Sequence, residues 1–264
     1  MINSSLIIAT YNWPQALECS LLSVMRQKQL PSEVIIADDG STKETAELIK
    51  SFQQKFPVPL RHIWHEDTGF RLGMIRNKAM AAASGDYLIQ ADGDIIMHPF
   101  FVADHLHAAR SSHFIGGSRV LLGQQLSANI IQNKTLDISL FHADVKNKLN
   151  GLHAPALARV IELFKKEKGL YNMRGCNMSF WRKDIIAVNG YNENISGWGR
   201  EDTELAIRLY NMGMKRVYFK LQGIAYHLFH KEYDRSSLLA NDEILNATIA
   251  NKLTCCENGI SKYI

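Results

Sequence analysis

The sequence predicts an α/β fold with a mixed, mainly parallel sheet flanked by helices. Two observations carry this prediction. Short apolar runs alternate with amphipathic helical stretches through the first half of the chain, which is the pattern of βαβ units. The chain has 264 residues, of which 46% are hydrophobic and 21% charged, so its size and composition fit one large globular domain or two small ones.

The first half contains four predicted strands, each followed by a helix. The strands are Ser5–Ala9, Glu33–Ala37, Leu60–Trp64 and Tyr87–Ala91. The helices that follow them are, in order, Trp13–Arg26, Thr42–Gln54, Gly73–Ala83 and Phe100–Arg110. In such sheets the ligand binds beyond the carboxyl ends of the strands. Three polar groups are expected to meet there, namely Thr10-Tyr11-Asn12, Asp38-Asp39 and Asp92-Gly93-Asp94.

The second half is less regular. Its predicted strands are Ile115–Leu122, Cys176–Trp181, Val217–Phe219 and Ile224–His227. Its predicted helices are Pro155–Lys168, Arg182–Val188, Glu201–Met212 and Leu238–Leu253. The stretch Leu126–Leu152 has no clear period and is compatible with a mobile flap. Because no linker or low-complexity tract divides the chain, one merged domain is favoured over two independent ones.

The Asp92-Gly93-Asp94 motif follows the apolar run Tyr87–Ala91. Side chains at positions i and i+2 of a strand point the same way, so Asp92 and Asp94 are expected to converge on one divalent metal. Mg²⁺ is typically held by one or two carboxylates together with substrate phosphates. The motif therefore suggests an enzyme that acts on a diphosphate compound. By itself the tripeptide is also ordinary turn chemistry, and the other polar groups at this edge favour the metal.

Several classes of protein are disfavoured by what the sequence lacks. No G-x-G-x-x-G follows the first strand and there is no P-loop motif, which weighs against dinucleotide oxidoreductases and P-loop enzymes. The four cysteines form no CxxC pair, so a zinc site or a disulfide framework is not expected. This cysteine pattern fits a protein of the reducing cytosol. No signal-peptide pattern and no long apolar run is present, and we expect a protein that is neither exported nor membrane-spanning.

In combination these motifs resemble the GT-A fold glycosyltransferases of family 2, over positions 4 to 230. The segments that carry the resemblance are Ile7–Asn12, Ala37–Ser41, Arg76-Asn77, Gly85–Asp94, Asn189–Tyr191 and Gly197–Asp202. The stretch Gly69–Arg71 and the Trp-Gly-x-Glu-Asp element are most similar to the bacterial branch that contains the N-terminal domains of chondroitin polymerases. That closing element is also similar to one in animal galactosyltransferases and N-acetylgalactosaminyltransferases.

The resemblance implies a Rossmann-like, nucleotide-sugar-binding fold and a role for each matching residue. Asp202, or alternatively Glu201, would be the catalytic base. Asp94 and His227, with Asp92, would hold Mn²⁺ or Mg²⁺, although His230 is a rival to His227. Asp39 would accept a hydrogen bond from the uracil ring. The donor-binding residues would be Thr10, Tyr11, Asn12, Asp39, Arg71, Arg76, Asp92, Gly93 and Trp198.

The same resemblance implies an organisation and an activity. Residues 1–117 would form the nucleotide-sugar-binding half, 118–235 the acceptor-binding and catalytic half of the same merged domain, and 236–264 a C-terminal helical tail. The enzyme would transfer a hexose or N-acetylhexosamine, with inversion, from a UDP-sugar to a glycan or lipid-linked sugar acceptor. The product would be a bacterial surface glycan such as lipopolysaccharide, O-antigen or capsule, and no nucleic-acid partner is expected. A catalytically silent nucleotide-sugar or glycan-binding module is the alternative.

Each motif also has a purely structural interpretation. Asp38-Asp39-Gly40-Ser41 has the composition of a turn that caps a helix. Glu201 and Asp202 at a helix start favour the helix macrodipole, and Arg71 and Arg76 could form surface ion pairs. The intact set of acidic residues and His227 favours the catalytic interpretation over the silent one.

The middle of the chain is basic, with eight Lys or Arg against four Asp or Glu between positions 118 and 173. It is the natural acceptor side, because the first half is assigned to the donor. The predicted helix Pro155–Lys168 sets Ala158, Ile161, Leu163 and Phe164 beside Lys165, Lys166 and Lys168. This pattern fits contact with anionic lipid headgroups and also fits a helix packed on the sheet with a solvated basic edge, which we favour. The expected location is the cytoplasm, either free or peripheral at the inner face of the membrane.

Overall fold

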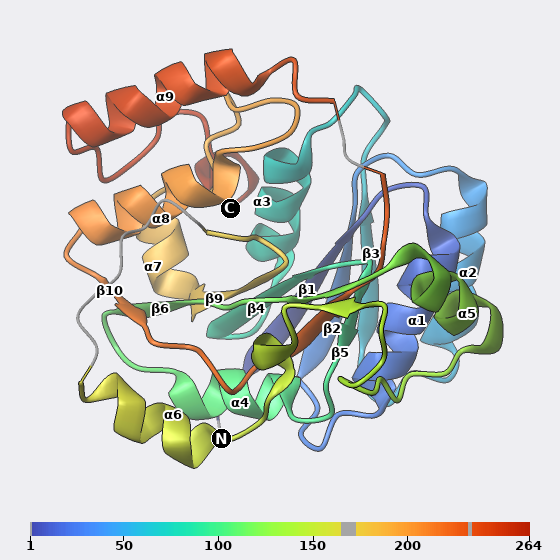
Figure 1. Ribbon diagram of the computed structural model, residues 1–264. Coiled ribbons are helices and arrows are strands. Elements are labelled where there is room, and N and C mark those ends of the chain that lie inside the picture. Colours follow the sequence, from blue (N-terminus) through green and yellow to red (C-terminus); the bar gives the residue numbers. More distant parts are fainter. Residues whose placement is uncertain (1, 165–172, 232–233) are drawn as a thin grey trace.

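The computed structural model describes residues 2–164, 173–231 and 234–264 and has a seven-stranded sheet at its centre (Figure 1). The sheet has the order β10-β6-β9-β4-β1-β2-β3. Its strands are β1 (Ser4–Thr10), β2 (Glu33–Asp38), β3 (Leu60–Trp64), β4 (Tyr87–Asp92), β6 (His113–Gly116), β9 (Asn177–Trp181) and β10 (Lys215–Val217). Only β9 runs antiparallel to its neighbours, β4 and β6. The predicted α/β class with a mainly parallel sheet is confirmed.

A smaller sheet of four strands continues from the carboxyl end of β4. It consists of β5 (Ile95–Met97), β11 (Ala225–His227), β7 (Val120–Leu122) and β8 (Val145–Lys146), in that order. Strand β11 pairs antiparallel with β5, so that His227 lies opposite Ile95. Because Ile95 directly follows Asp94, this pairing brings His227, from the second half of the chain, close to the metal motif of the first half.

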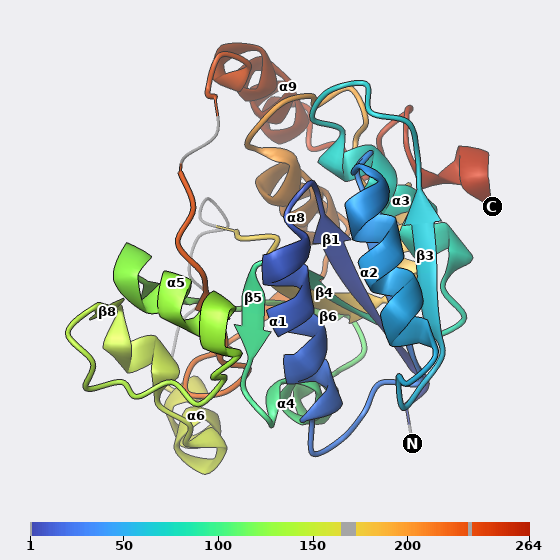
Figure 2. The same ribbon diagram turned by 90° about the vertical axis from the view of Figure 1, so that its right-hand side faces the viewer.

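Helices cover both faces of the large sheet, as Figures 1 and 2 show. On one face lie α1 (Pro14–Met25), α2 (Lys43–Gln53) and α4 (Phe101–Ala108). On the other lie α3 (Leu72–Ala82), α7 (Arg182–Ala187), α8 (Glu201–Asn211) and α9 (Leu238–Ala250). Alternate residues of β1 serve the two faces, since Leu6 packs toward the first group of helices and Ile7 toward the second. Both faces are therefore apolar, as expected for a sheet covered on both sides.

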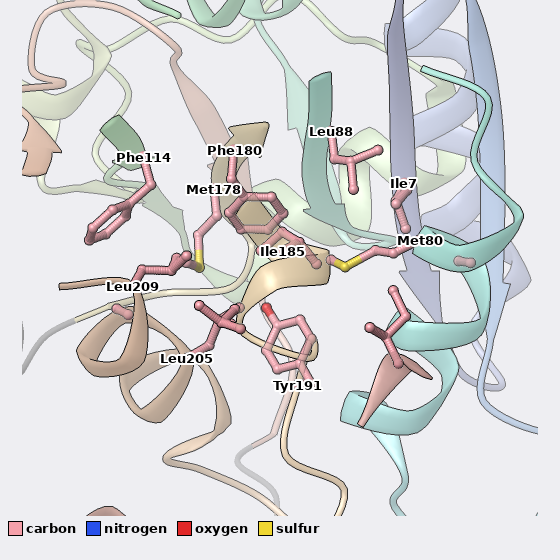
Figure 3. Close-up of a cluster of buried hydrophobic side chains, with 14 of the residues drawn as sticks. Ile7, Met80, Leu88, Phe114, Met178, Phe180, Ile185, Tyr191, Leu205 and Leu209 are labelled. Carbon is pink, nitrogen blue, oxygen red and sulfur yellow. The ribbon is translucent and has the colours of Figure 1, made fainter. Parts of the chain in front are cut away.

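The core under α8 contains the aromatic ring of Tyr191 (Figure 3). Its neighbours include Leu205 from α8, Phe180 from β9 and Met80 from α3, all of them fully buried. The packing matters for the site because the Tyr191 hydroxyl reaches out of this core toward the polar edge of the sheet. A residue of the hydrophobic core thus fixes the position of polar groups.

Three sequence predictions about elements are wrong. The strand predicted at Ile115–Leu122 is two strands in different sheets, β6 and β7, separated at Gly117. A Cβ atom at Gly117 would lie 2.4 Å from the side chain of Asn177, so the chain turns there at a position that only glycine fits. The strand predicted at Val217–Phe219 is β10 (Lys215–Val217), so Phe219 lies beyond its end, although Phe219 shares a small core with Val217 and Ile115. Helix α9 ends at Ala250, so Leu253 lies beyond it.

The stretch without a clear period contains regular elements. These are α5 (Gln124–Asn133), β8 and the 3-10 helix η1 (Lys148–Gly151). Helix α6 (Pro155–Glu162) begins where the sequence predicts but ends at Glu162, so Leu163 and Phe164 lie beyond it, and Lys165, Lys166 and Lys168 lie outside the described residues. A second 3-10 helix, η2 (Ile260–Tyr263), was not predicted. In the described part of the chain no helix is long and apolar enough to span a membrane.

Candidate active site

A pocket of about 470 Å³ opens at the carboxyl ends of β1 and β4. It collects most of the residues that the sequence pointed to, although they come from both halves of the chain. The predicted site residues that line it are Thr10, Tyr11, Asp39, Arg76, Asp92, Gly93, Asp94, Trp198, Glu201, Asp202 and His227. Each of the three polar groups expected at this edge contributes to the pocket, although their members Asn12 and Asp38 do not line it.

Two predicted donor contacts, Asn12 and Arg71, are not among the lining residues. The Asn12 backbone N–H donates to Ser41 Oγ, and its side-chain oxygen accepts from the Thr42 N–H, each at 2.8 Å. The Arg71 backbone N–H donates to Asp39 Oδ2 at 2.9 Å. Both residues hold the loops beneath the pocket in this structure, and their roles as donor contacts stay predictions.

One end of the pocket, which we call the metal end, contains Asp94, His227 and His230. One potential ligand atom from each of these residues lies within 4.8 Å of the other two. The Asp94 Oδ2 atom is 3.5 Å from His227 Nε2 and 3.4 Å from His230 Nε2. Asp94 Oδ1 is buried and has no hydrogen-bond partner in the described part of the chain. The donor atoms present fit a divalent metal ion, which would satisfy that oxygen.

The geometric reason given for this metal site needs correction. Asp92 ends β4, but Asp94 lies in the turn between β4 and β5 rather than on a strand, so strand alternation does not bring the two carboxylates together. Asp94 meets the histidines because β5 pairs with β11. Asp92 is not a member of the three-residue group, although it lines the same pocket.

Burial sets the protonation of the metal end. It raises the pKa of Asp94 to about 6, against the opposing effect of the charges of His230 and Arg119. Burial also lowers the pKa of His227 to about 4, and the charge of Arg119 acts in the same direction. His227 is therefore a neutral imidazole near pH 7, which is the form that ligates metals.

The opposite end, which we call the base end, is built around the Arg76 guanidinium on α3. Arg76 is 1% exposed and bridges two carboxylates, since its Nη2 lies 2.7 Å from Asp92 Oδ1 and its Nη1 lies 3.0 Å from Asp202 Oδ1. Asp202 also accepts hydrogen bonds from the Tyr191 hydroxyl at 3.0 Å and from the Gly175 N–H at 2.6 Å. Asp202 is thus oriented by three donors from separate parts of the fold.

Glu201 precedes Asp202 at the start of α8 and has a different environment. It is buried, and its Oε2 atom has no hydrogen-bond partner among the described residues. Burial, followed by the neighbouring charge of Asp202, raises the pKa of Glu201 to about 8. Glu201 therefore carries a proton at neutral pH, whereas Asp202 faces a guanidinium.

The remaining predicted donor contacts that line the pocket include Tyr11, Asp39 and Trp198. The carboxylate of Asp39 is buried, with Oδ1 2.7 Å from His65 Nε2 and Oδ2 accepting from the Arg71 N–H. The Tyr11 hydroxyl donates to Asp67 at 2.8 Å. Trp198 stands between Gly197 and Gly199, whose φ angles of 70° and 101° favour glycine, and is 36% exposed. The Arg235 guanidinium lies 5.2 Å above its ring.

Sequence reasoning missed four contributors to the site. His230 was treated as a rival of His227, whereas both belong to the same group. The Tyr191 hydroxyl and the Gly175 N–H hold Asp202, but only tertiary packing brings them there. Arg119 lines the pocket beside the metal end, and no motif surrounds it in the sequence. The spacing of His227 and His230 is the sequence signal that could have placed both histidines in this group.

Curated proteins with similar sequences are bacterial glycosyltransferases. The chain is 27% identical over 243 residues to the hyaluronan synthase of Pasteurella multocida, covering 86% of this chain and 24% of that protein. It is 25% identical over 253 residues to the chondroitin synthase of Escherichia coli, covering 84% of this chain and 34% of that protein. A validoxylamine A glucosyltransferase of Streptomyces hygroscopicus subsp. limoneus is 25% identical, covering 80% of this chain and 48% of that protein. The chain thus spans less than half the length of each of these relatives.

Solved structures share the fold at lower identity. The structure of GalNAc-T7 with UDP, GalNAc and Mn²⁺ has a TM-score of 0.64 at 15% identity, covering 99% of this chain and 53% of that one. The mannosyltransferase PcManGT of Pyrobaculum calidifontis, in complex with GDP-Man and Mn²⁺, has a TM-score of 0.60 at 16% identity, covering 96% and 63%. These likenesses show that the fold is GT-A, as expected.

Family models give the final comparison. Residues 155–231 match a model described as the N-terminal domain of galactosyltransferase. Residues 5–185, which are more than half of the chain, match the model of glycosyl transferase family 2. With the synthase relatives, these matches confirm the predicted resemblance, and the chain belongs to glycosyl transferase family 2.

Proposed function

We propose that this chain is a metal-dependent, inverting glycosyltransferase that uses a UDP-sugar as donor. It would transfer a hexose or N-acetylhexosamine to a sugar hydroxyl of a growing bacterial surface glycan. The observation that carries the proposal is one pocket with a group of potential metal ligands at one end and the oriented carboxylate of Asp202 at the other. A glycosyl transfer needs both, because it must stabilise a leaving diphosphate and deprotonate a hydroxyl.

The metal end supports Mn²⁺ over Mg²⁺ as the ion. Carboxylate oxygen suits either ion, whereas imidazole nitrogen suits transition metals. Asp94, His227 and His230 together offer one carboxylate and two imidazoles. When bound, the ion would act as a Lewis acid on the diphosphate of the donor. Asp92 and Asp39 would face the ribose and the uracil ring.

The base end supports Asp202 rather than Glu201 as the general base. Glu201 holds a proton at neutral pH, because its pKa is raised to about 8 by burial and by the charge of Asp202. Asp202 accepts hydrogen bonds from Arg76, Tyr191 and Gly175 and so has a fixed orientation in the pocket. It would take the proton of the acceptor hydroxyl during attack at the anomeric carbon. One base and one displacement lead to inversion of configuration.

The acceptor class rests on sequence relatives rather than on a contact in the pocket. The hyaluronan and chondroitin synthases are named for polysaccharides, so we propose a glycan acceptor, free or linked to lipid. Trp198, which is partly exposed at the pocket, supports this because an aromatic face packs well on a sugar ring. Membrane contact through α6 is kept as the alternative to a packed helix with a solvated edge, since Leu157 and Val160 on this helix are 52% and 53% exposed.

A thermal-shift panel tests the donor and the metal together. UDP, GDP, TDP and CMP are each added with Mn²⁺, with Mg²⁺ and without metal. A ligand at one hundred times its Kd stabilises the folded state by about 2.7 kcal/mol, so UDP with Mn²⁺ is expected to give the largest rise in Tm. A rise specific to GDP or TDP would keep the enzyme and overturn the donor. No rise with any nucleotide would contradict the proposed function and favour a silent module.

Membrane contact has its own test. If α6 contacts the membrane, the protein should sediment with vesicles of anionic lipid at low salt and be released at high salt. The variant Leu157→Ser, on the exposed side of α6, should sediment less. Absence of the wild-type protein from the low-salt pellet would rule out this contact and leave the donor assignment unaffected.

A further inference from the structure

Arg119 lines the pocket and forms no ion pair with a carboxylate of the described residues. It directly precedes β7, and the pairing of β7 with β11 fixes it beside the strand that carries His227. Its Nη1 atom lies 3.8 Å from the sulfur of Cys176, which is a weak acceptor. Its Nε atom is buried without a hydrogen-bond partner, and within the described ranges no carboxylate forms an ion pair with it.

The other arginines of the pocket differ from Arg119. Arg76 bridges Asp92 and Asp202, Arg200 pairs with Asp242 at 2.5 Å, and Arg235 lies over Trp198. Arg174 is exposed, so water solvates its charge. Arg119 is half-buried, and its buried Nε–H has no hydrogen-bond partner among the described residues, which is unfavourable until an acceptor binds to it. Arg119 therefore has hydrogen-bonding capacity left for an anion.

The position of Arg119 identifies the anion. Arg119 lines the same pocket as Asp94 and His227. His227 lies opposite Leu121, two positions after Arg119, so the guanidinium belongs to the metal end. A divalent ion at that end would bring the phosphates of the donor with it. The planar guanidinium fork matches phosphate oxygens and forms paired hydrogen bonds with them.

We propose that Arg119 binds the diphosphate of the sugar donor next to the metal and neutralises charge on the departing nucleoside diphosphate. The inference rests on the proposed function, because it needs a donor with a diphosphate. The bound ion and Asp94 together carry one positive charge, which is less than the charge of the diphosphate. Arg119 supplies a second positive charge as the bond between the anomeric carbon and the phosphate oxygen breaks and that oxygen takes the electron pair.

The test compares binding of uridine and UDP, each with saturating Mn²⁺, to the wild-type protein and to Arg119→Gln. Hydrogen bonds to charged groups are strong enough that Arg119→Gln is expected to weaken UDP about tenfold or more, with uridine unchanged. Arg119→Lys should recover part of the loss, because lysine keeps the charge but lacks the fork. Arg174→Gln is the matched control, since it removes the same charge from an exposed position of the same pocket.

A loss of Mn²⁺ binding can be distinguished from a loss of diphosphate binding. Removing a positive charge near Asp94 should leave Mn²⁺ affinity unchanged or increase it, so Mn²⁺ binding to Arg119→Gln is measured without nucleotide. Unchanged UDP affinity in Arg119→Gln, or an equal loss for uridine and UDP, would overturn the inference while the proposed function stands. An equal loss in Arg174→Gln would also overturn it. If the wild-type protein binds no nucleotide, the proposed function itself fails.

Discussion

The two ends of the pocket differ in how far their polar groups are already satisfied. At the base end, Asp202 accepts from Arg76, Tyr191 and Gly175. At the metal end, one oxygen of Asp94 is buried with no partner in the described chain, and its two histidines lie 3.4 and 3.5 Å from the other oxygen. The difference teaches that the fold alone orients Asp202, whereas Asp94 keeps a buried oxygen that a bound ion would satisfy.

The change Asp202→Asn tests the base end with the largest expected effect. An amide keeps the shape of the side chain but cannot take a proton. Transfer is expected to fall by about 10²–10⁴-fold, which is the usual contribution of a general base. Binding of UDP with Mn²⁺ should persist, since Asp202 does not belong to the three-residue group at the metal end. Activity is measured as nucleotide release, and affinity by calorimetry.

Asp94→Asn is the matched change at the metal end. It should abolish the dependence of nucleotide binding on Mn²⁺, because it removes the carboxylate that joins the two histidines. If Asp202→Asn and Asp94→Asn impair Mn²⁺ binding equally, the two ends do not act separately and the comparison fails.

Replacing Arg76 tests whether the base end is preorganised. Arg76→Met leaves the carboxylates of Asp92 and Asp202 without their shared counter-charge in a buried place. Breaking a buried ion pair from one side typically costs about 3–5 kcal/mol, and the free energy of unfolding in urea should fall by this amount. Arg110→Met is the control, because its pair with Glu162 is partly exposed, with side chains 46% and 23% accessible, and should contribute about 0–1 kcal/mol. Similar losses in both variants would argue against a preorganised base end.

The smallest expected effect concerns Glu201 and pH. Its pKa is raised to about 8 in the folded state from an ordinary value of 4.5. Between these values the folded state binds more protons than the unfolded state, so this residue contributes a loss of stability as pH rises. Glu201→Gln should therefore raise Tm at pH 8 relative to wild type by more than at pH 5. Glu47→Gln, at an exposed position of α2, should show no such difference, and equal shifts for Glu201→Gln at both pH values would contradict the assignment.

Local patterns explain why the first half could be predicted from sequence. Strands β1 to β4 and the helices between them lie close to their predicted ends. Each forms around apolar residues that are near one another in the chain, such as Leu6 to Ala9, which are buried on both faces of the sheet. The shared edge of the parallel strands then follows from topology, and with it the meeting of Thr10, Asp39 and Asp92.

The rest of the site depends on contacts between residues that are distant in sequence. Strands β5, β7, β8 and β11 have two or three residues each, too few for a recognisable period. Asp94 lies near His227 and His230 because β5 pairs with β11. The sequence pointed to these three residues, but strand alternation was the wrong reason for a metal site at Asp94. Arg76 was predicted as a donor contact, whereas in the structure it bridges Asp92 and Asp202, the second of which lies 126 positions from Arg76 in the chain.

The antiparallel strand β9 has a consequence for how the chain is made. It lies between β4 and β6 in the sheet, with Tyr87 opposite Trp181. When β1 to β4 have emerged from the ribosome, the β4 edge of the sheet therefore has no partner until the segment Asn177–Trp181 emerges. Synthesis proceeds at about 5–20 residues per second, so that edge stays open for seconds, and open edges pair with other chains. Closing so long a loop is slow, and nascent or refolding molecules should depend on dilution or chaperones until β9 inserts.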